Sequence, residues 1–128
     1  MKKRFILTVC LVVLMVFATQ VFAEYDKDMV VKVMKSNGAA MGDLKKAAED
    51  GEFFMAAEKL MEIAKNMKSL DAVTPTKGSK KDWDKNHGAI IKAAFKGIGA
   101  CGDEDAEALN KYIGEIGGLI KEGHGMFK

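Results

Sequence analysis

Hydrophobic residues recur every three or four positions from Asp28 to the C-terminus, with almost no alternation of period two. This spacing places them on one face of an α-helix, whereas successive residues of a strand point to opposite sides. The pattern therefore predicts an all-α chain. Segments that break the period divide it into four amphipathic helices, expected at about residues 26–48, 53–70, 82–98 and 103–127.

Two short connections and one longer connection join these helices. Gly51 is expected to end the first helix, and the acidic residues at 103–105 favour the start of the fourth. The middle connection, residues 71–81, contains the one proline of the chain, and Asp82 is the expected N-cap of the third helix. Helices and connections of these lengths predict an antiparallel four-helix bundle of up-down-up-down topology over residues 24–128.

The first 23 residues have the three parts of a secretory signal peptide. A basic start, Met1–Arg4, precedes an uncharged apolar run from Phe5 to Phe17, and Val21 and Ala23 stand at positions −3 and −1 of a cleavage site. The alternative is a retained membrane anchor, but the apolar run is short for the ~20 residues that span a bilayer. We therefore predict a periplasmic protein with no membrane attachment after signal cleavage.

Signal cleavage would change the charge of the protein. The chain of 128 residues has 20 basic and 18 acidic residues and a formal charge of +2, and residues 1–23 contain three of the basic residues and no acid. Since 17 basic and 18 acidic residues remain, the formal charge becomes −1. A near-neutral chain with interspersed charges lacks the basic patch of a nucleic-acid-binding protein, so no nucleic-acid partner is expected.

Residues 24–128 contain a single cysteine, Cys101, which excludes an internal disulfide. Two interpretations of Cys101 remain open. It is either a partly exposed thiol in the connection before the last helix, able to link two chains, or a buried and inert side chain.

The predicted helices offer few groups for catalysis. His87 and His124 stand in different helices, and one cysteine cannot complete a zinc site. Glu122 precedes His124 by two positions, whereas di-iron bundles use Glu-x-x-His pairs with a spacing of three. We therefore expect no enzymatic activity.

The last helix has two unusual features. His124 lies on its apolar stripe, four residues after Ile120. Gly114, Gly117 and Gly118 lie within the helix, where each glycine costs about 1 kcal/mol relative to alanine. Glycine is tolerated there when another backbone or a flat ligand approaches closely, and the sequence favours neither explanation.

The end of the chain resembles the C-terminal helix of the cytochrome c′ family, in which an apolar lead-in with glycine, a CxxCH motif and an aromatic-basic pair follow one another. The segment 116–128, IGGLIKEGHGMFK, matches the lead-in, the histidine, the aromatic residue and the final basic residue. Ile120 and Gly123 stand where the family has its two cysteines. Three upstream segments are also similar to the family and occur in the same order: Met34–Gly42, Gly51–Phe53 and Asp82–Trp83.

This resemblance implies a haem site within the bundle. His124 would be the proximal iron ligand, and Val31 would face the distal side of the iron. Without the two cysteines the implied cofactor is a non-covalent haem b, and no covalent haem c is expected. The related soluble b-type four-helix cytochromes use a first-helix methionine, so Met34 is the first candidate for the distal ligand, with Met29 and His87 as alternatives. The other residues expected at the site are Lys27, Gly117, Gly118, Ile120, Gly123, Phe127 and Lys128.

The resemblance also implies electron transfer to a redox partner protein. It further implies a homodimer through the first two helices, where Phe53, Phe54 and Met55 give an apolar surplus. The alternative function is that of a haem-free descendant acting as a periplasmic binding or structural module. In that case the space of the haem would be filled by a set of apolar side chains: Met34, Leu119, Ile120 and Met126.

Overall fold

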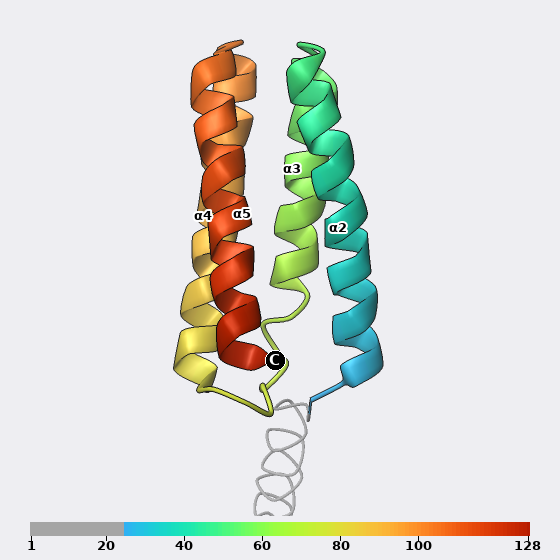
Figure 1. The fold of residues 1–128 in the computed structure, drawn as a ribbon, viewed down its shortest axis with the longest axis vertical. Helices are drawn as coiled ribbons and strands as arrows, with labels where there is room; N and C mark the ends of the chain where they lie inside the picture. Colours follow the sequence, from blue (N-terminus) through green and yellow to red (C-terminus); the bar gives the residue numbers. More distant parts are fainter. Residues whose placement is uncertain (1–24) are drawn as a thin grey trace, which may run out of the picture.

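The computed structural model describes residues 25–128, which form four α-helices. The helices are α2 (Lys27–Glu49), α3 (Phe53–Lys68), α4 (Lys80–Gly102) and α5 (Ala106–Phe127). Consecutive helices run antiparallel and pack side by side, so the predicted up-down-up-down four-helix bundle is confirmed (Figure 1). The signal peptide predicted for residues 1–23 lies outside the described residues.

Side-chain caps begin three of the four helices. Asp26, Ser79 and Asp105 each accept a hydrogen bond of 3.0–3.1 Å from the backbone N–H three residues later. Such a bond satisfies one of the free N–H groups in the first turn of a helix. The prediction of Asp82 as the N-cap of the third helix is wrong, because Asp82 lies in the first turn of α4 and donates its own N–H to Ser79.

The helix α4 continues through the glycines that were expected to follow its end, up to Gly102. The predicted end at residue 98 is therefore wrong: the backbone N–H of Asp103, the C-cap, donates to the carbonyl of Gly99 and closes the last turn beyond these glycines. Earlier in α4, a Cβ at Gly97 would lie 2.9 Å from Cδ1 of Leu60, so glycine lets α4 approach α3 closely at this point. Cys101 is buried in the last turn of α4, and burial raises the pKa of its thiol. Cys101 is therefore the buried side chain, and not an exposed thiol in a connection.

The core consists mainly of apolar side chains that recur at helical spacing on the inner faces of the four helices. The largest fully buried side chains come from all four helices and from the start of the α3–α4 connection: Leu44, Leu60, Ile63, Met67, Leu70, Val73, Ile90, Leu109 and Ile116. Gly51 has φ +71°, a left-handed conformation that favours glycine, and it forms the turn after α2 as predicted. None of the described helices has the length and apolar character needed to cross a bilayer.

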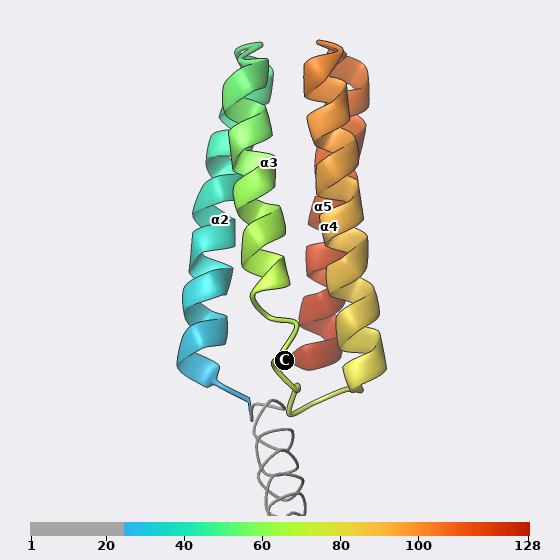
Figure 2. The ribbon, with the colours of Figure 1, turned by 180° about the vertical axis from the view of Figure 1, so that it is seen from behind.

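The α3–α4 connection, residues 69–79, passes close to the C-terminal end of α5 (Figure 2). Gly78 has φ +81°, and a Cβ on it would lie 2.8 Å from the ring of Phe127. The Lys77 ammonium donates to the carbonyl of Lys128 at 2.6 Å. This connection therefore anchors the end of α5 and fixes the position of the helical turn that carries His124.

Candidate functional site

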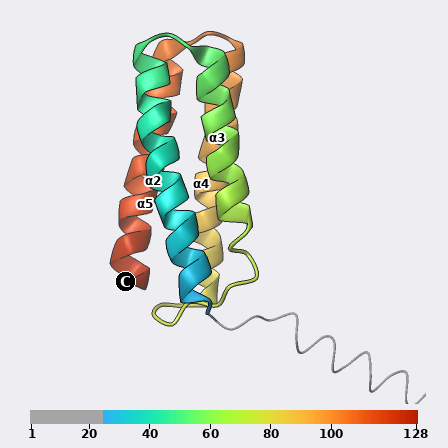
Figure 3. The same cartoon turned by 90° about the vertical axis from the view of Figure 1, so that its right-hand side faces the viewer.

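The helices α2 and α5 are the least closely packed of the four neighbouring pairs. The stripe of α5 is fully buried at Leu109 and Ile116, but Ile120 is only partly buried and His124 is exposed. On α2, Val31 is 40% exposed. Both helices therefore uncover apolar side chains at the same end of the bundle, where α2 begins and α5 ends (Figure 3).

A groove of about 520 Å³ lies between these two helices, and we call it the α2/α5 groove. Val31, Met34 and Met41 contribute apolar lining from α2, and Ile120 contributes it from α5. His124 and Gly117 line the α5 side. The volume falls within the ~300–1,000 Å³ that is usual for small-molecule and cofactor sites.

A smaller cavity of about 110 Å³ continues from the groove into the bundle. It shares Val31, Met34, Ile120, His124 and Lys128 with the groove. Its inner lining includes side chains from α3 and α4: Met67, Asn86 and Ile90. The site is therefore open to solvent on one side and reaches the apolar interior on the other.

The structure brings most of the predicted site residues together. Six of them line the α2/α5 groove: Val31, Met34, Gly117, Ile120, His124 and Lys128. Gly123 and Phe127 line the inner cavity. Lys27 and Gly118 are exposed and line neither space. Met29, an alternative distal ligand, is partly buried and also lines neither space.

Gly123 is explained by a helix contact. A Cβ on Gly123 would lie 2.8 Å from Oδ1 of Asn86, which is itself buried. The amide of Asn86 donates to the carbonyl of Leu119 at 2.9 Å. Asn86 of α4 is thus held against the α5 turn that leads to His124, and glycine at position 123 permits this approach. By contrast, a Cβ at Gly117 would meet nothing within 4 Å, so Gly117 leaves open space in the groove.

His87, the other alternative distal ligand, lies in the interior and lines neither the groove nor the inner cavity. It is 3% exposed, and its ring centroid is 4.2 Å from that of Trp83 and 6.4 Å from that of Phe127. Its Nδ1 has no hydrogen-bond partner among the described residues. Burial lowers the pKa of His87 to about 4, so the imidazole is neutral at pH 7.

Sequence reasoning missed three polar residues of the groove, Lys35, Asn37 and Lys45. With Lys128, the two lysines give the groove three ammonium groups, and no acidic side chain among the described residues lines it. Asn37 is buried, with its amide bonded to Met67 Sδ and Asn66. A signal was available, because the α2 lining residues 31, 34, 38, 41 and 45 form a second stripe of helical spacing beside the core stripe.

Two of the residues expected to fill an unused haem space lie elsewhere. Leu119 and Met126 line a separate hollow of about 220 Å³ between α4 and α5, together with Lys85 and Glu122. Met34 and Ile120 line the α2/α5 groove but leave it open.

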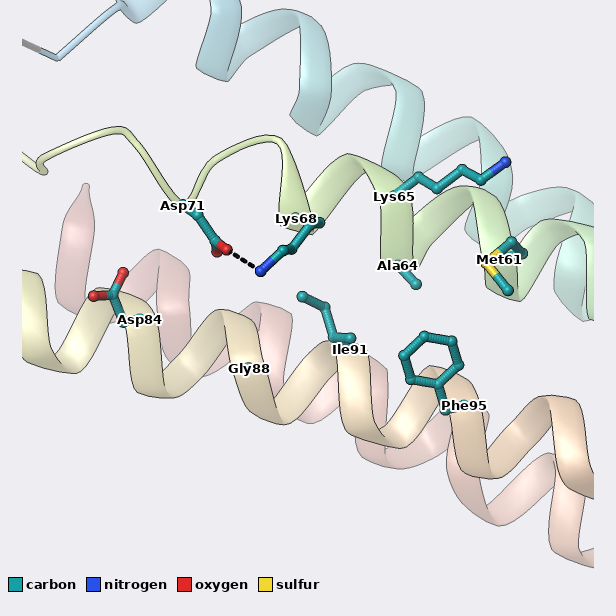
Figure 4. A pocket seen from close by; sticks show the side chains of 9 residues that line it. All are labelled: Met61, Ala64, Lys65, Lys68, Asp71, Asp84, Gly88, Ile91 and Phe95. Carbon is teal, nitrogen blue, oxygen red and sulfur yellow. Dashed lines mark ion pairs between the residues drawn. The ribbon is translucent and has the colours of Figure 1, made fainter. Parts of the chain in front are cut away.

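A hollow of about 730 Å³, larger than the α2/α5 groove, lies on another face, between α3 and α4. Figure 4 shows Ala64, Ile91 and Phe95 along it. At one end Lys68 and Asp71 form an ion pair of 2.6 Å (Figure 4). None of the predicted haem-site residues lies in this α3/α4 groove.

Residues 25–128 contain no cluster of three or more His, Cys, Asp or Glu side chains that could hold a metal ion. Comparison with known proteins gives no match to a protein-family model, to a curated protein or to a solved structure. The class of protein defined by fold and site is therefore a four-helix bundle with an open, cationic groove that contains a histidine. Membership of the cytochrome c′ family is a prediction that is based only on the sequence motifs described above.

Proposed function

We propose that this protein binds haem non-covalently in the α2/α5 groove, with His124 as the proximal iron ligand, and serves electron transfer. The observation that carries the proposal is that His124 lies in an open groove with an apolar floor and a cationic rim, at a position predicted from the sequence. Export to the periplasm and action on a redox partner protein belong to the same proposal.

The groove residues suit a haem in three respects. Val31, Met34 and Ile120 provide apolar surface for the macrocycle. Lysine ammonium groups at positions 35, 45 and 128 suit the two propionate carboxylates. The His124 ring forms no hydrogen bond or ion pair among the described residues, so no competing partner has to be displaced from its nitrogens.

Haem bound in this groove would supply a one-electron iron couple, and axial histidine and methionine ligands would raise its reduction potential. Met34 is the proposed distal ligand because it lines both the groove and the inner cavity that His124 lines. The chain itself would cover one face of the macrocycle with α5 and the other with α2, and it would leave an edge open to solvent, where a partner protein can approach.

A haem-free binding module is the second candidate function. It is favoured by the core, because Leu44, Leu60 and Leu109 are 0% exposed and are covered by other side chains of the same chain. In this case the groove would take another amphipathic anion, and haem would not bind.

Haemin titration followed by the Soret absorption band tests the proposal. We expect the wild type to shift the band, and we expect His124→Ala to weaken binding by about tenfold or more. Lys121→Ala is the matched control, because Lys121 is exposed on the same helix and does not line the groove. Absence of a band shift with the wild type, or an unchanged shift with His124→Ala, would contradict the proposal.

A second test fills the groove without touching an iron ligand. A leucine at position 117 would project into open space lined by groove residues, so Gly117→Leu is expected to weaken haemin binding by about tenfold or more while the fold is kept. The neighbouring Gly118→Leu is the control, because Gly118 is exposed outside the groove. Equal haemin affinity in the two variants would show that haem does not occupy this groove.

A further inference from the structure

The outer face of α3 carries a stripe of five residues that the bundle leaves exposed or only partly buried. Phe54, Glu58, Met61, Lys65 and Lys68 follow one another at spacings of four and three, which places them on one side of the helix. Met61 is partly buried, the other four are exposed, and Phe54 is 82% exposed. Large apolar side chains rarely remain uncovered in a continuous surface without a partner.

A second stripe, on α4, runs beside the first. Asp84, Gly88, Ile91 and Phe95 follow the same four-three-four spacing and line the α3/α4 groove together with Met61 of α3 (Figure 4). Phe95 is 53% exposed. Of the four large apolar side chains that are exposed in the described chain, three belong to α3 and α4: Phe54, Met55 and Phe95.

The charges on the α3 stripe are arranged so that the stripe complements itself. Glu58 lies three residues before Met61, and Lys65 lies four residues after it. Glu58, Met61 and Lys65 also line one shallow hollow, which confirms that they share a face. When a second copy of α3 lies antiparallel to the first, with the two Met61 residues at the same height, Glu58 of each copy therefore lies opposite Lys65 of the other. Among residues 25–128 neither Glu58 nor Lys65 forms an ion pair, so both charges are available to another molecule.

The same antiparallel arrangement brings the apolar residues of α4 together. Gly97 of α4 packs against Leu60 of α3, so Phe95 lies near the height of Met61 in the antiparallel pair. Figure 4 shows Phe95 and Met61 facing each other at one end of the α3/α4 groove. A two-fold axis at this height sets both phenylalanines and both methionines at the centre of an interface, with the charged pairs on either side.

We propose that the outer face of α3 and α4 binds a second copy of this chain, in an antiparallel homodimer in which Glu58 of each copy pairs with Lys65 of the other. Such an interface is isologous, since the same patch serves both copies. It has apolar residues at its centre and charges at its rim, as stable interfaces do. The interface uses α3 and α4, whereas the sequence pointed to the first two helices. The proposal does not depend on haem binding, because the α2/α5 groove lies on another face.

Charge reversal tests this arrangement, with the dimer dissociation constant measured by sedimentation equilibrium of the full protein. Glu58→Lys and Lys65→Glu each place like charges opposite one another and are expected to raise the dissociation constant by about tenfold or more. The double variant Glu58→Lys/Lys65→Glu restores opposite charges in the exchanged positions, so it is expected to dimerise like the wild type. Glu115→Lys, an exposed change on α5, is the matched control and should leave the dissociation constant unchanged.

Phe95→Ser gives an independent readout, because its ring is half-exposed in one copy and would be covered in the dimer. We expect this variant to keep the helical circular dichroism spectrum and to dimerise at least about tenfold more weakly. A monomeric wild type at several hundred micromolar would overturn the proposal. It would also be overturned by a dimer that survives the single reversals, or by a double variant that fails to restore dimerisation.

Discussion

The glycines of α5 have different structural roles, although all of them lie in the same helix and are close together in the sequence. Gly117 leaves room in the α2/α5 groove, Gly118 faces solvent, and Gly123 accommodates Asn86 of α4. The sequence left close helix approach and ligand approach equally open. The two explanations can be distinguished only by whether the glycine contacts a residue of another helix. The periodicity along α5 contains no information about such a contact.

Gly123→Ala is expected to destabilise the fold by about 1 kcal/mol. The added Cβ would gain about 1 kcal/mol of helix propensity, but it would displace the buried Asn86 amide from its bond to Leu119, which costs about 1–3 kcal/mol. Urea unfolding measures the difference. Gly125→Ala is the control, because its Cβ would meet nothing and should stabilise the helix. Equal stabilisation by both substitutions would contradict the assigned role of Gly123.

The buried His87 is expected to make the free energy of unfolding depend on pH. Burial lowers its pKa from 6.5 to about 4, while Asp71 and Asp84 partly raise it and Lys80 lowers it. The folded state therefore favours the neutral imidazole, and the unfolded chain takes up a proton first as the pH falls. The stability contributed by His87 is complete above about pH 6.5 and is lost as the pH approaches 4, by up to about 3 kcal/mol.

The free energy of urea unfolding at pH 7 and pH 4.5 measures this loss. Since carboxylates also titrate in this range, the comparison is with His87→Phe, which keeps an aromatic ring against Trp83 but cannot be protonated. The variant should lose less stability than the wild type between the two pH values. An equal loss in the two proteins would show that His87 is not the responsible group.

At the scale of helices, the apolar stripes were predictable and the helix ends were less so. The stripes follow from spacing alone, and in the structure each of the four helices buries apolar side chains at this spacing. The N-cap of α4 was placed three residues too late because Ser79 and Asp82 are both good caps, and the choice depends on backbone geometry. Its end was placed too early because Gly99 and Gly102 were interpreted as helix terminators, whereas α4 continues through Gly99 and ends at Gly102.

The caps of α4 can be distinguished by substitution. Ser79→Ala is expected to cost about 1 kcal/mol, because it removes the acceptor for the N–H of Asp82. Asp82→Ala should cost only a few tenths of a kcal/mol, since Asp82 contributes only its charge near the helix N-terminus. Thermal unfolding of both variants measures the difference. A larger loss for Asp82→Ala would support the cap predicted from the sequence.

At the scale of the whole molecule, the bundle follows from four amphipathic segments, but the opening between α2 and α5 does not. Periodicity shows which face of a helix is apolar and not how far two helices lie apart at each end. The similarity to the cytochrome c′ family supplied the candidate residues, and six of them line one groove. The lysines at positions 35 and 45 were not predicted as site residues, because lysines on an exposed helix face usually contact only solvent.

The absorption spectrum of the protein purified from a periplasmic extract, followed by a pyridine haemochrome assay, tests the central claim most directly. We predict a Soret band in the purified protein, a haemochrome spectrum of the b type, and haem that acid-acetone extracts completely. A protein that carries no haem as isolated and takes up none from haemin would contradict the claim, and so would haem that remains attached to the chain after extraction.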